Sequence, residues 1–150
     1  MKNLKLFENW KNLHKRLEKK IKDDKSNETE YDYKTINIQG KDIIYSTIDR
    51  EIINDKNVGK YAVINFTYDD DHNIKYFVKN NIGKITKSKL AGGKIFYDIK
   101  YENIPLEIRH FFTQRDYDSS ISYLIKIKED CFIGKYEQCE IYISANKYNL

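Results

Sequence analysis

The clearest pattern in the sequence is the alternation of apolar and polar residues within Lys60–Tyr101, which predicts an antiparallel meander. Two alternating runs, Tyr61–Tyr68 and Asn73–Lys79, flank the polar stretch 69–72, as the strands of a β-hairpin flank their turn. A third run, Lys94–Tyr101, carries large apolar residues at every second position. They are Ile95, Tyr97, Ile99 and Tyr101. An isolated hairpin is marginally stable in water, so we expect a larger sheet to form around these runs.

Shorter alternating runs on both sides of the meander extend the expected sheet. Before it, strands are predicted at Thr35–Gln39 and Asp42–Ile48, with Gly40 as a turn or bulge between them. After it, strands are predicted at Ser120–Lys128 and Gln138–Ala145. In these last two strands the residues expected to face the core are Ile121, Tyr123, Ile125 and Ile127, then Cys139, Ile141, Ile143 and Ala145.

Helical spacing marks two further segments. Near the N-terminus apolar residues recur every three or four positions, which predicts an amphipathic helix over residues 1–22. They are Leu6, Trp10, Leu13, Leu17 and Ile21. We expect this stripe to pack across the sheet or, alternatively, to dock on a partner. Residues 23–34 are polar and predict a linker, and Pro105 begins a second short helix at about 105–116.

These elements predict one α+β domain over residues 1–150. Its antiparallel, meander-like sheet of five to seven strands lies within residues 35–150. The N-terminal amphipathic helix and the second short helix are expected to cover it. A chain of this length buries enough surface to fold without disulfides or metals, so Cys131 and Cys139 are expected to be free thiols.

Composition and charge narrow the functional classes. The net charge is +4, but residues 1–25 carry nine basic and four acidic side chains, so the remainder of the chain is near neutral. That distribution disfavours a fold-wide nucleic-acid surface. Abundant Lys and 13 Tyr beside a single Pro are typical of AT-rich coding, as in a phage or mobile element. The sequence lacks both an apolar secretory segment and an 18-residue apolar run, so we expect a cytoplasmic protein without membrane contact.

Basic and aromatic residues supply the candidate binding surface. The run Asn80–Gly93 and its border contain lysines without acidic residues, which predicts either a strand with lysine-decorated edges or a mobile basic loop. Two tyrosines fall on the polar sides of their predicted strands, and exposed tyrosines favour interfaces. The candidate binding residues are therefore Lys84, Lys87, Lys89, Lys94, Tyr61 and Tyr142.

One triplet points instead to metal-dependent chemistry. On a strand, Asp98 and Lys100 share one face. This triplet, within the order helix, strands, helix and strand, resembles the restriction-endonuclease-like nucleases. The resemblance implies a Mg²⁺ ion held by Asp98 and a second carboxylate such as Asp71, with Lys100 orienting a water. The spacing departs from the family pattern because almost thirty residues separate the two acids. The bland alternatives are a surface ion pair and a solvated turn.

The leading expectation is a small intracellular binding protein that regulates or inhibits a protein partner with an acidic surface. No cofactor or metal is expected, because His14, His72 and His110 lie far apart and no nucleotide-binding or nucleophile motif is present. A nucleic-acid-binding protein and a nuclease are the alternatives. With only four arginines, any nucleic-acid affinity is expected to be weak and independent of sequence.

Overall fold

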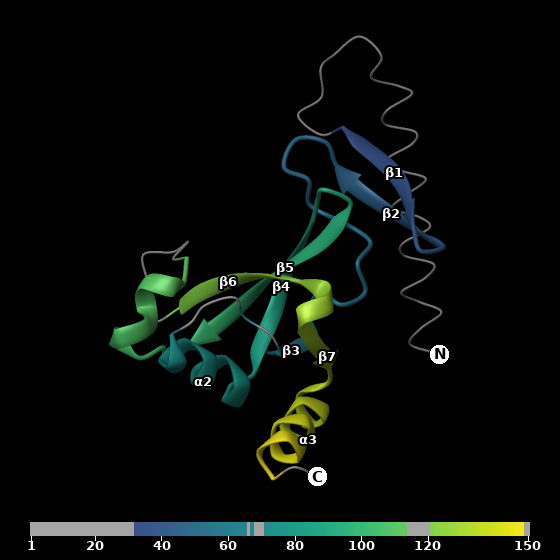
Figure 1. Ribbon diagram of the computed structural model, residues 1–150. Coiled ribbons are helices and arrows are strands. Elements are labelled where there is room, and N and C mark those ends of the chain that lie inside the picture. Colours follow the sequence, from purple (N-terminus) through teal and green to yellow (C-terminus); the bar gives the residue numbers. More distant parts are fainter. Residues whose placement is uncertain (1–31, 66, 68–70, 114–120, 149–150) are drawn as a thin grey trace. The chain divides into compact units, whose positions relative to one another are not determined.

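The computed structural model describes residues 32–65, 67, 71–113 and 121–148. The chain divides into two compact units, Met1–Asn54 and Asp55–Leu150. In chain order the elements are β1 (Tyr33–Ile38), β2 (Lys41–Ser46), β3 (Tyr61–Ile64), α2 (His72–Asn80), β4 (Gly83–Ala91), β5 (Lys94–Glu102), the 3₁₀-helix η1 (Leu106–Phe111), β6 (Ile121–Ile127), the 3₁₀-helix η2 (Lys128–Asp130), β7 (Cys131–Gly134) and α3 (Tyr136–Lys147) (Figure 1).

The first unit contains the antiparallel hairpin of β1 and β2, as the sequence predicts. Gln39 and Gly40 both have positive φ, 51° and 80°, in the two-residue turn between the strands. This is the backbone geometry that matches the twist of a tight hairpin, and Gly40 supplies it without steric cost. The side chain of Asn54 closes the unit, since it accepts a hydrogen bond from Ile44 N and donates one to Asp42 O.

The second unit is built on a five-stranded antiparallel sheet with the order β6-β5-β4-β3-β7. Its edge strands β6 and β7 are nevertheless joined by only three residues, those of η2. Across a flat sheet four strand spacings amount to about 19 Å, whereas three residues of 3₁₀-helix advance about 6 Å. The sheet therefore has to curl strongly. A β-bulge between Ile85 and Lys87 lies in its longest strand pair and adds to the bend.

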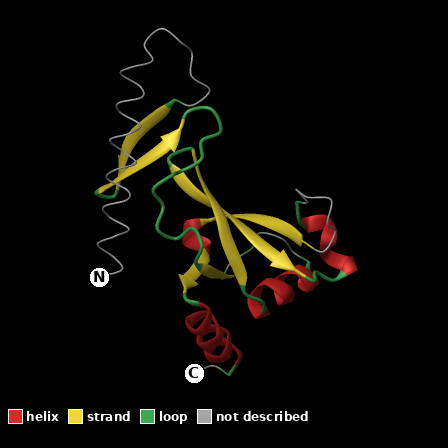
Figure 2. Cartoon of the chain, turned by 180° about the vertical axis from the view of Figure 1, so that it is seen from behind, coloured by secondary structure: helices red, strands yellow, loops and turns green. Residues whose placement is uncertain are grey.

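One face of β4, β5 and β6 carries the core, and we call it the inner face. Its buried members are Ile85, Ser88, Leu90, Ile95, Tyr97, Ile99, Tyr101, Ser122 and Leu124. Helix α2 and η1 lie side by side against it (Figures 1 and 2). The rings of Phe77, Tyr101 and Phe112 meet there at centroid distances of 5.5–5.8 Å. The four alternate apolar residues of the predicted run Lys94–Tyr101 share this face and are all buried.

The predicted strand Asn73–Lys79 is wrong, because this segment forms α2. Its buried residues, Ile74, Phe77 and Val78, follow a helical spacing, whereas Tyr76 is 72% exposed. The end of the polar stretch 69–72 is a helix start and not a hairpin turn. Asp71 caps the helix by accepting hydrogen bonds from the backbone N–H groups of residues 73 and 74 at 2.8 and 3.3 Å.

The predicted strand Gln138–Ala145 is also wrong, because it lies within α3. Cys139 is buried, as expected, but Ile141 is exposed, and Ile143 and Ala145 are half-buried. Ring contacts hold the helix to β3 and β7, since Tyr136 meets Tyr61 edge-on and Tyr142 stacks on Phe132. These contacts come from residues distant in sequence, so the local pattern does not contain them.

Strand β6 occurs where the sequence predicts it, but with the opposite face inward. Ser122 and Leu124 are buried, whereas Ile125 is 51% exposed and Tyr123 and Ile127 are half-buried. The register with β5 decides this orientation, because Tyr101 pairs with Ser122 and Ile99 with Leu124. Residues that pair across an antiparallel ladder lie on the same face.

The α+β class and the antiparallel sheet are confirmed, although the strands form two sheets and not one. The second short helix is confirmed as a 3₁₀-helix, which ends at Phe111. The predicted N-terminal helix over 1–22 lies outside the described residues, as does most of the polar linker 23–34.

Candidate functional site

The candidate binding lysines gather on the second face of β4, β5 and β6, which we call the outer face. Cross-strand pairing places its residues in three rows, because each β5 residue lies between one partner on β4 and one on β6. The rows are Lys84–Lys100–Tyr123, Lys87–Asp98–Ile125 and Lys89–Phe96–Ile127. Lys94 lies on the same side of β5, next to the turn formed by Gly92 and Gly93. All four predicted lysines therefore share one surface.

The first row continues onto β3. Tyr61 pairs with Lys84 on one side and with Gly134 of β7 on the other. A line across the sheet therefore reads Tyr61, Lys84, Lys100 and Tyr123, with two ammonium groups between two aromatic rings. Tyr61 and Lys84 are separate candidates in the sequence, and the strand register brings them side by side.

The lysines of β4 are electrostatically available within the described part of the chain. Lys84 and Lys87 are exposed and Lys89 is half-buried, and none of the three forms an ion pair with a described carboxylate. Lys100 lies 3.8 Å from Glu102, and this pair is solvent-accessible. Such a pair contributes little to stability. Beyond Ile85, β4 pairs only with β5 among the described strands, so Lys87 and Lys89 also lie on a strand edge.

The outer face is not purely basic. Asp98 is only 2% exposed and lies between Lys87 and Ile125 in its row. Ile125 and Phe96 add apolar surface beside the lysines. Asp98 therefore contributes almost no surface, and the patch is basic and apolar, which is the composition of a protein-binding surface more than of a phosphate-binding one.

Tyr142, the remaining candidate binding residue, packs within the fold. Its ring stacks on Phe132 of β7 with a centroid distance of 4.2 Å and an interplanar angle of 6°. Its hydroxyl forms a hydrogen bond with Asn65 Oδ1. These contacts hold α3 against β7 and the end of β3, and Tyr142 is not a member of the three rows.

The nuclease-like set is only partly assembled. Asp98 and Lys100 share the outer face, as predicted, but Asp71 is an exposed residue that caps α2. Within the described residues no group of three His, Cys, Asp or Glu side chains could hold a metal ion. The metal-dependent alternative therefore stays a prediction carried by the triplet alone.

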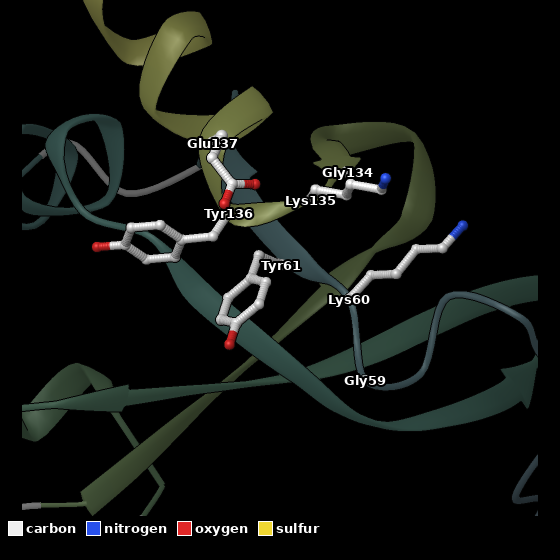
Figure 3. A pocket seen from close by; sticks show the side chains of 7 residues that line it. All are labelled: Gly59, Lys60, Tyr61, Gly134, Lys135, Tyr136 and Glu137. Carbon is white, nitrogen blue, oxygen red and sulfur yellow. The ribbon is translucent and has the colours of Figure 1, made fainter.

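An open pocket of about 390 Å³ lies where β3 begins and β7 leads into α3 (Figure 3). Two lysines, two tyrosines, one glutamate and two glycines form its walls. The lining residues are Gly59, Lys60, Tyr61, Gly134, Lys135, Tyr136 and Glu137. Tyr61 and Tyr136 meet edge-to-face at 5.3 Å and 83°. Of these residues only Tyr61 is a candidate from the sequence. Lys60 and Lys135 come together through the pairing of β3 with β7, and nothing in the local sequence indicates this.

A buried polar network fixes the loop that leads into this pocket. Ser88 Oγ donates a 2.6 Å hydrogen bond to Asp55 Oδ2, and Asn57 Nδ2 donates a 2.9 Å bond to the hydroxyl of Tyr97. Asn57 N also donates to Asp55 Oδ1 at 2.9 Å. Burial raises the pKa of Tyr97 above its usual range. The loop is thereby tied to the inner face just before Lys60.

The thiols have no signature of a reactive site. Burial, with the nearby charges of Asp130 and Glu129, raises the pKa of Cys131 to about 12. Burial also raises the pKa of Cys139. Both are free cysteines, and each stays protonated at neutral pH, whereas the thiolate is the nucleophilic form.

No protein-family model, curated protein or solved structure matches this chain. Among the described residues no helix is both long and apolar enough to cross a membrane. The functional inference therefore depends on the surfaces of the chain itself.

Proposed function

We propose that this chain is a small, non-enzymatic binding protein that regulates or inhibits a protein partner through its outer face. An intracellular setting and an origin in a phage or mobile element are part of this proposal. The observation that carries it is the convergence of Lys84, Lys87 and Lys89 on one sheet surface beside exposed apolar residues. The proposed partner presents an acidic surface.

Electrostatics and apolar area have different roles on such a surface. Lysines free of ion pairs attract an acidic partner over a distance and raise the association rate at low salt. Ile125 and Phe96 offer apolar area that becomes buried once the surfaces meet. Because Lys is a flexible point charge, it suits steering better than the bidentate recognition provided by Arg.

The proposal is tested by affinity capture from cells, followed by titration with the purified partner. The baits are wild type, the K84E/K87E/K89E variant and a matched K56E/K75E/K79E variant, whose lysines lie in the loop before β3 and on α2. We expect the first variant to lose the partner and the matched variant to keep it. We also expect wild-type affinity to fall with added salt. Equal capture by all three baits would contradict the role of the outer face.

Single-stranded nucleic acid is the second candidate, favoured by the row Tyr61, Lys84, Lys100 and Tyr123. Aromatic rings can stack on bases while lysines contact phosphates. The apolar area of Ile125 and Phe96 beside the lysines suits a protein partner more than a phosphate backbone, so we rank nucleic acid second. Titration with an oligothymidylate distinguishes the two, since the protein proposal predicts weak binding at moderate salt.

A further inference from the structure

We infer that the pocket between β3 and α3 is an anchor site for an acidic side chain of the partner, which rests on the proposed function. In this arrangement a carboxylate lies between the ammonium groups of Lys60 and Lys135. A neighbouring residue along the partner chain packs against the rings of Tyr61 and Tyr136.

The geometry of the walls supports a small anionic group. Figure 3 shows the side chains of Lys60 and Lys135 extending in the same direction, away from the rings of Tyr61 and Tyr136. Lys60 Nζ donates one hydrogen bond, of 3.3 Å, to Asn57 Oδ1. The other N–H groups of this ammonium group remain available to a ligand. Neither lysine forms an ion pair with a described carboxylate. The remaining charge on the walls is Glu137, so the pocket is net positive.

Two features make this site more selective than the open lysine rows. Gly59 lines it without a side chain, and no other group lies within 4 Å of the place where a Cβ atom would be, which leaves room for a group to approach the backbone. The aromatic pair is already in place, because Tyr61 is set by the sheet register and Tyr136 by the start of α3. Preformed rings cost little ordering entropy on binding and are typical of interface anchors.

The site also adjoins the outer face. Tyr61 pairs directly with Lys84, so an acidic segment held in the pocket can continue along the row toward Lys100. Charge complementarity along this path favours an extended acidic polypeptide with a carboxylate at one end of the row. The pocket would then fix the register of the segment, while the rows supply attraction.

The test uses the full chain and a fluorescein-labelled peptide of ten glutamates as the probe, measured by anisotropy at low salt. We expect K60Q/K135Q to weaken binding about fivefold, as the loss of two exposed charge contacts implies. The matched K75Q/K79Q variant removes the same charge from α2 and is expected to bind within twofold of wild type. Tyr136→Ala is expected to weaken binding, whereas Tyr76→Ala, which removes an exposed tyrosine from α2, is not.

The outcomes separate this inference from the proposed function. Equal losses of affinity in K60Q/K135Q and K75Q/K79Q would show that only the net charge of the chain matters. That result would overturn the anchor site. Unchanged binding by K60Q/K135Q, together with loss in K84E/K87E/K89E, would overturn the anchor site and leave the outer-face proposal standing. No binding of the peptide by wild type would overturn both. Tighter binding of a ten-residue oligothymidylate that depends on the same lysines would assign the pocket to phosphate and overturn the acidic-peptide anchor.

Discussion

The two faces of the β4–β5–β6 sheet share the same backbone ladders, but the inner face forms the core and the outer face is the proposed binding surface. The inner face is closed by α2 and η1, and its polar groups are few. Ser88 and Tyr97 form hydrogen bonds with Asp55 and Asn57 of the loop before β3, whereas the hydroxyls of Tyr101 and Ser122 are buried without a hydrogen-bond partner among the described residues. The outer face alternates with it residue by residue, yet it presents lysines, one buried acid and half-exposed apolar side chains. Neighbouring positions on one strand belong to different faces. Substitutions can therefore change the stability of the fold and the proposed binding independently.

The largest contrast between the faces is expected from shortening one isoleucine on each. Ile99 is fully buried on the inner face, and Ile99→Ala is expected to cost about 3 kcal/mol through lost burial and a residual cavity. Ile125 lies on the neighbouring strand but faces outward and is half-exposed. Ile125→Ala is expected to cost below about 1 kcal/mol. Urea unfolding of both variants measures the difference, and equal costs would contradict the assignment of faces.

A second contrast involves space on the inner face. A Cβ atom at Gly83 would lie 2.3 Å from Ile99 Cγ2 and 2.8 Å from Tyr101 Cζ, so Gly83→Ala is expected to destabilise by about 1–3 kcal/mol. At Gly134 the nearest atom is Gln138 Oε1, the end of a flexible side chain. Gly134→Ala is therefore expected to cost less. The melting temperatures of the two variants are compared. A Gly83→Ala protein that is more stable than the Gly134→Ala protein would show that the strands can move apart at Gly83 to accept a methyl group.

The polar network of the inner face is expected to give a smaller effect. Tyr97→Phe removes the acceptor of the Asn57 hydrogen bond and is expected to cost about 1 kcal/mol. Because the loop before Lys60 is tied through this bond, the variant is also expected to exchange its loop amides faster. Hydrogen exchange that stays at the wild-type rate in residues 55–60 would show that the bond does not restrain the loop.

The raised pKa values predict how stability depends on pH. Cys131 keeps its proton in the folded state until pH about 12, and burial also raises the pKa values of Tyr97 and Tyr101. In the unfolded chain these groups ionise from about pH 9 to 10 upward. The folded state then binds more protons, so its stability is complete below about pH 8 and falls as pH rises toward about 12. Urea unfolding at pH 8 to 11 checks this, and a constant midpoint would contradict it.

The sequence predicted what depends on local alternation and missed what depends on distant contacts. In β5 the alternation separates the two faces correctly, because only one of its two residue sets is uniformly apolar. In β6 both sets contain apolar residues, so only the register with β5 decides which set is buried. In α2, the spacing of Ile74 and Val78 fits both the two-residue period of a strand and the period of a helix. The cap at Asp71 and the burial of Phe77 distinguish the helix from the strand.

The candidate site divides in the same way. The lysines of β4 were visible as an acid-free run, and their common face follows from strand geometry. The pocket was not predictable, because its lysines lie 75 positions apart and meet only when β3 pairs with β7. Its Tyr136 was hidden by the mistaken strand assignment of the segment that follows it.

The smallest effect on stability is expected from the outer face itself. K84E/K87E/K89E is expected to change the free energy of unfolding by less than about 0.5 kcal/mol, since exposed charges contribute little. The variant should unfold cooperatively at nearly the wild-type midpoint. A large loss of stability would mean that these lysines support the fold, and the binding results for the variant could not then be assigned to the surface.

The most direct test of the central claim maps binding onto the two faces in one experiment. Amide and side-chain shifts of the isotope-labelled chain are recorded by NMR during titration with the ten-glutamate peptide. The account predicts shifts that cluster at Tyr61, Lys84, Lys87 and Lys100, with little change on α2. Shifts concentrated on α2, or spread evenly over both faces, would contradict the claim that the outer face is the binding surface.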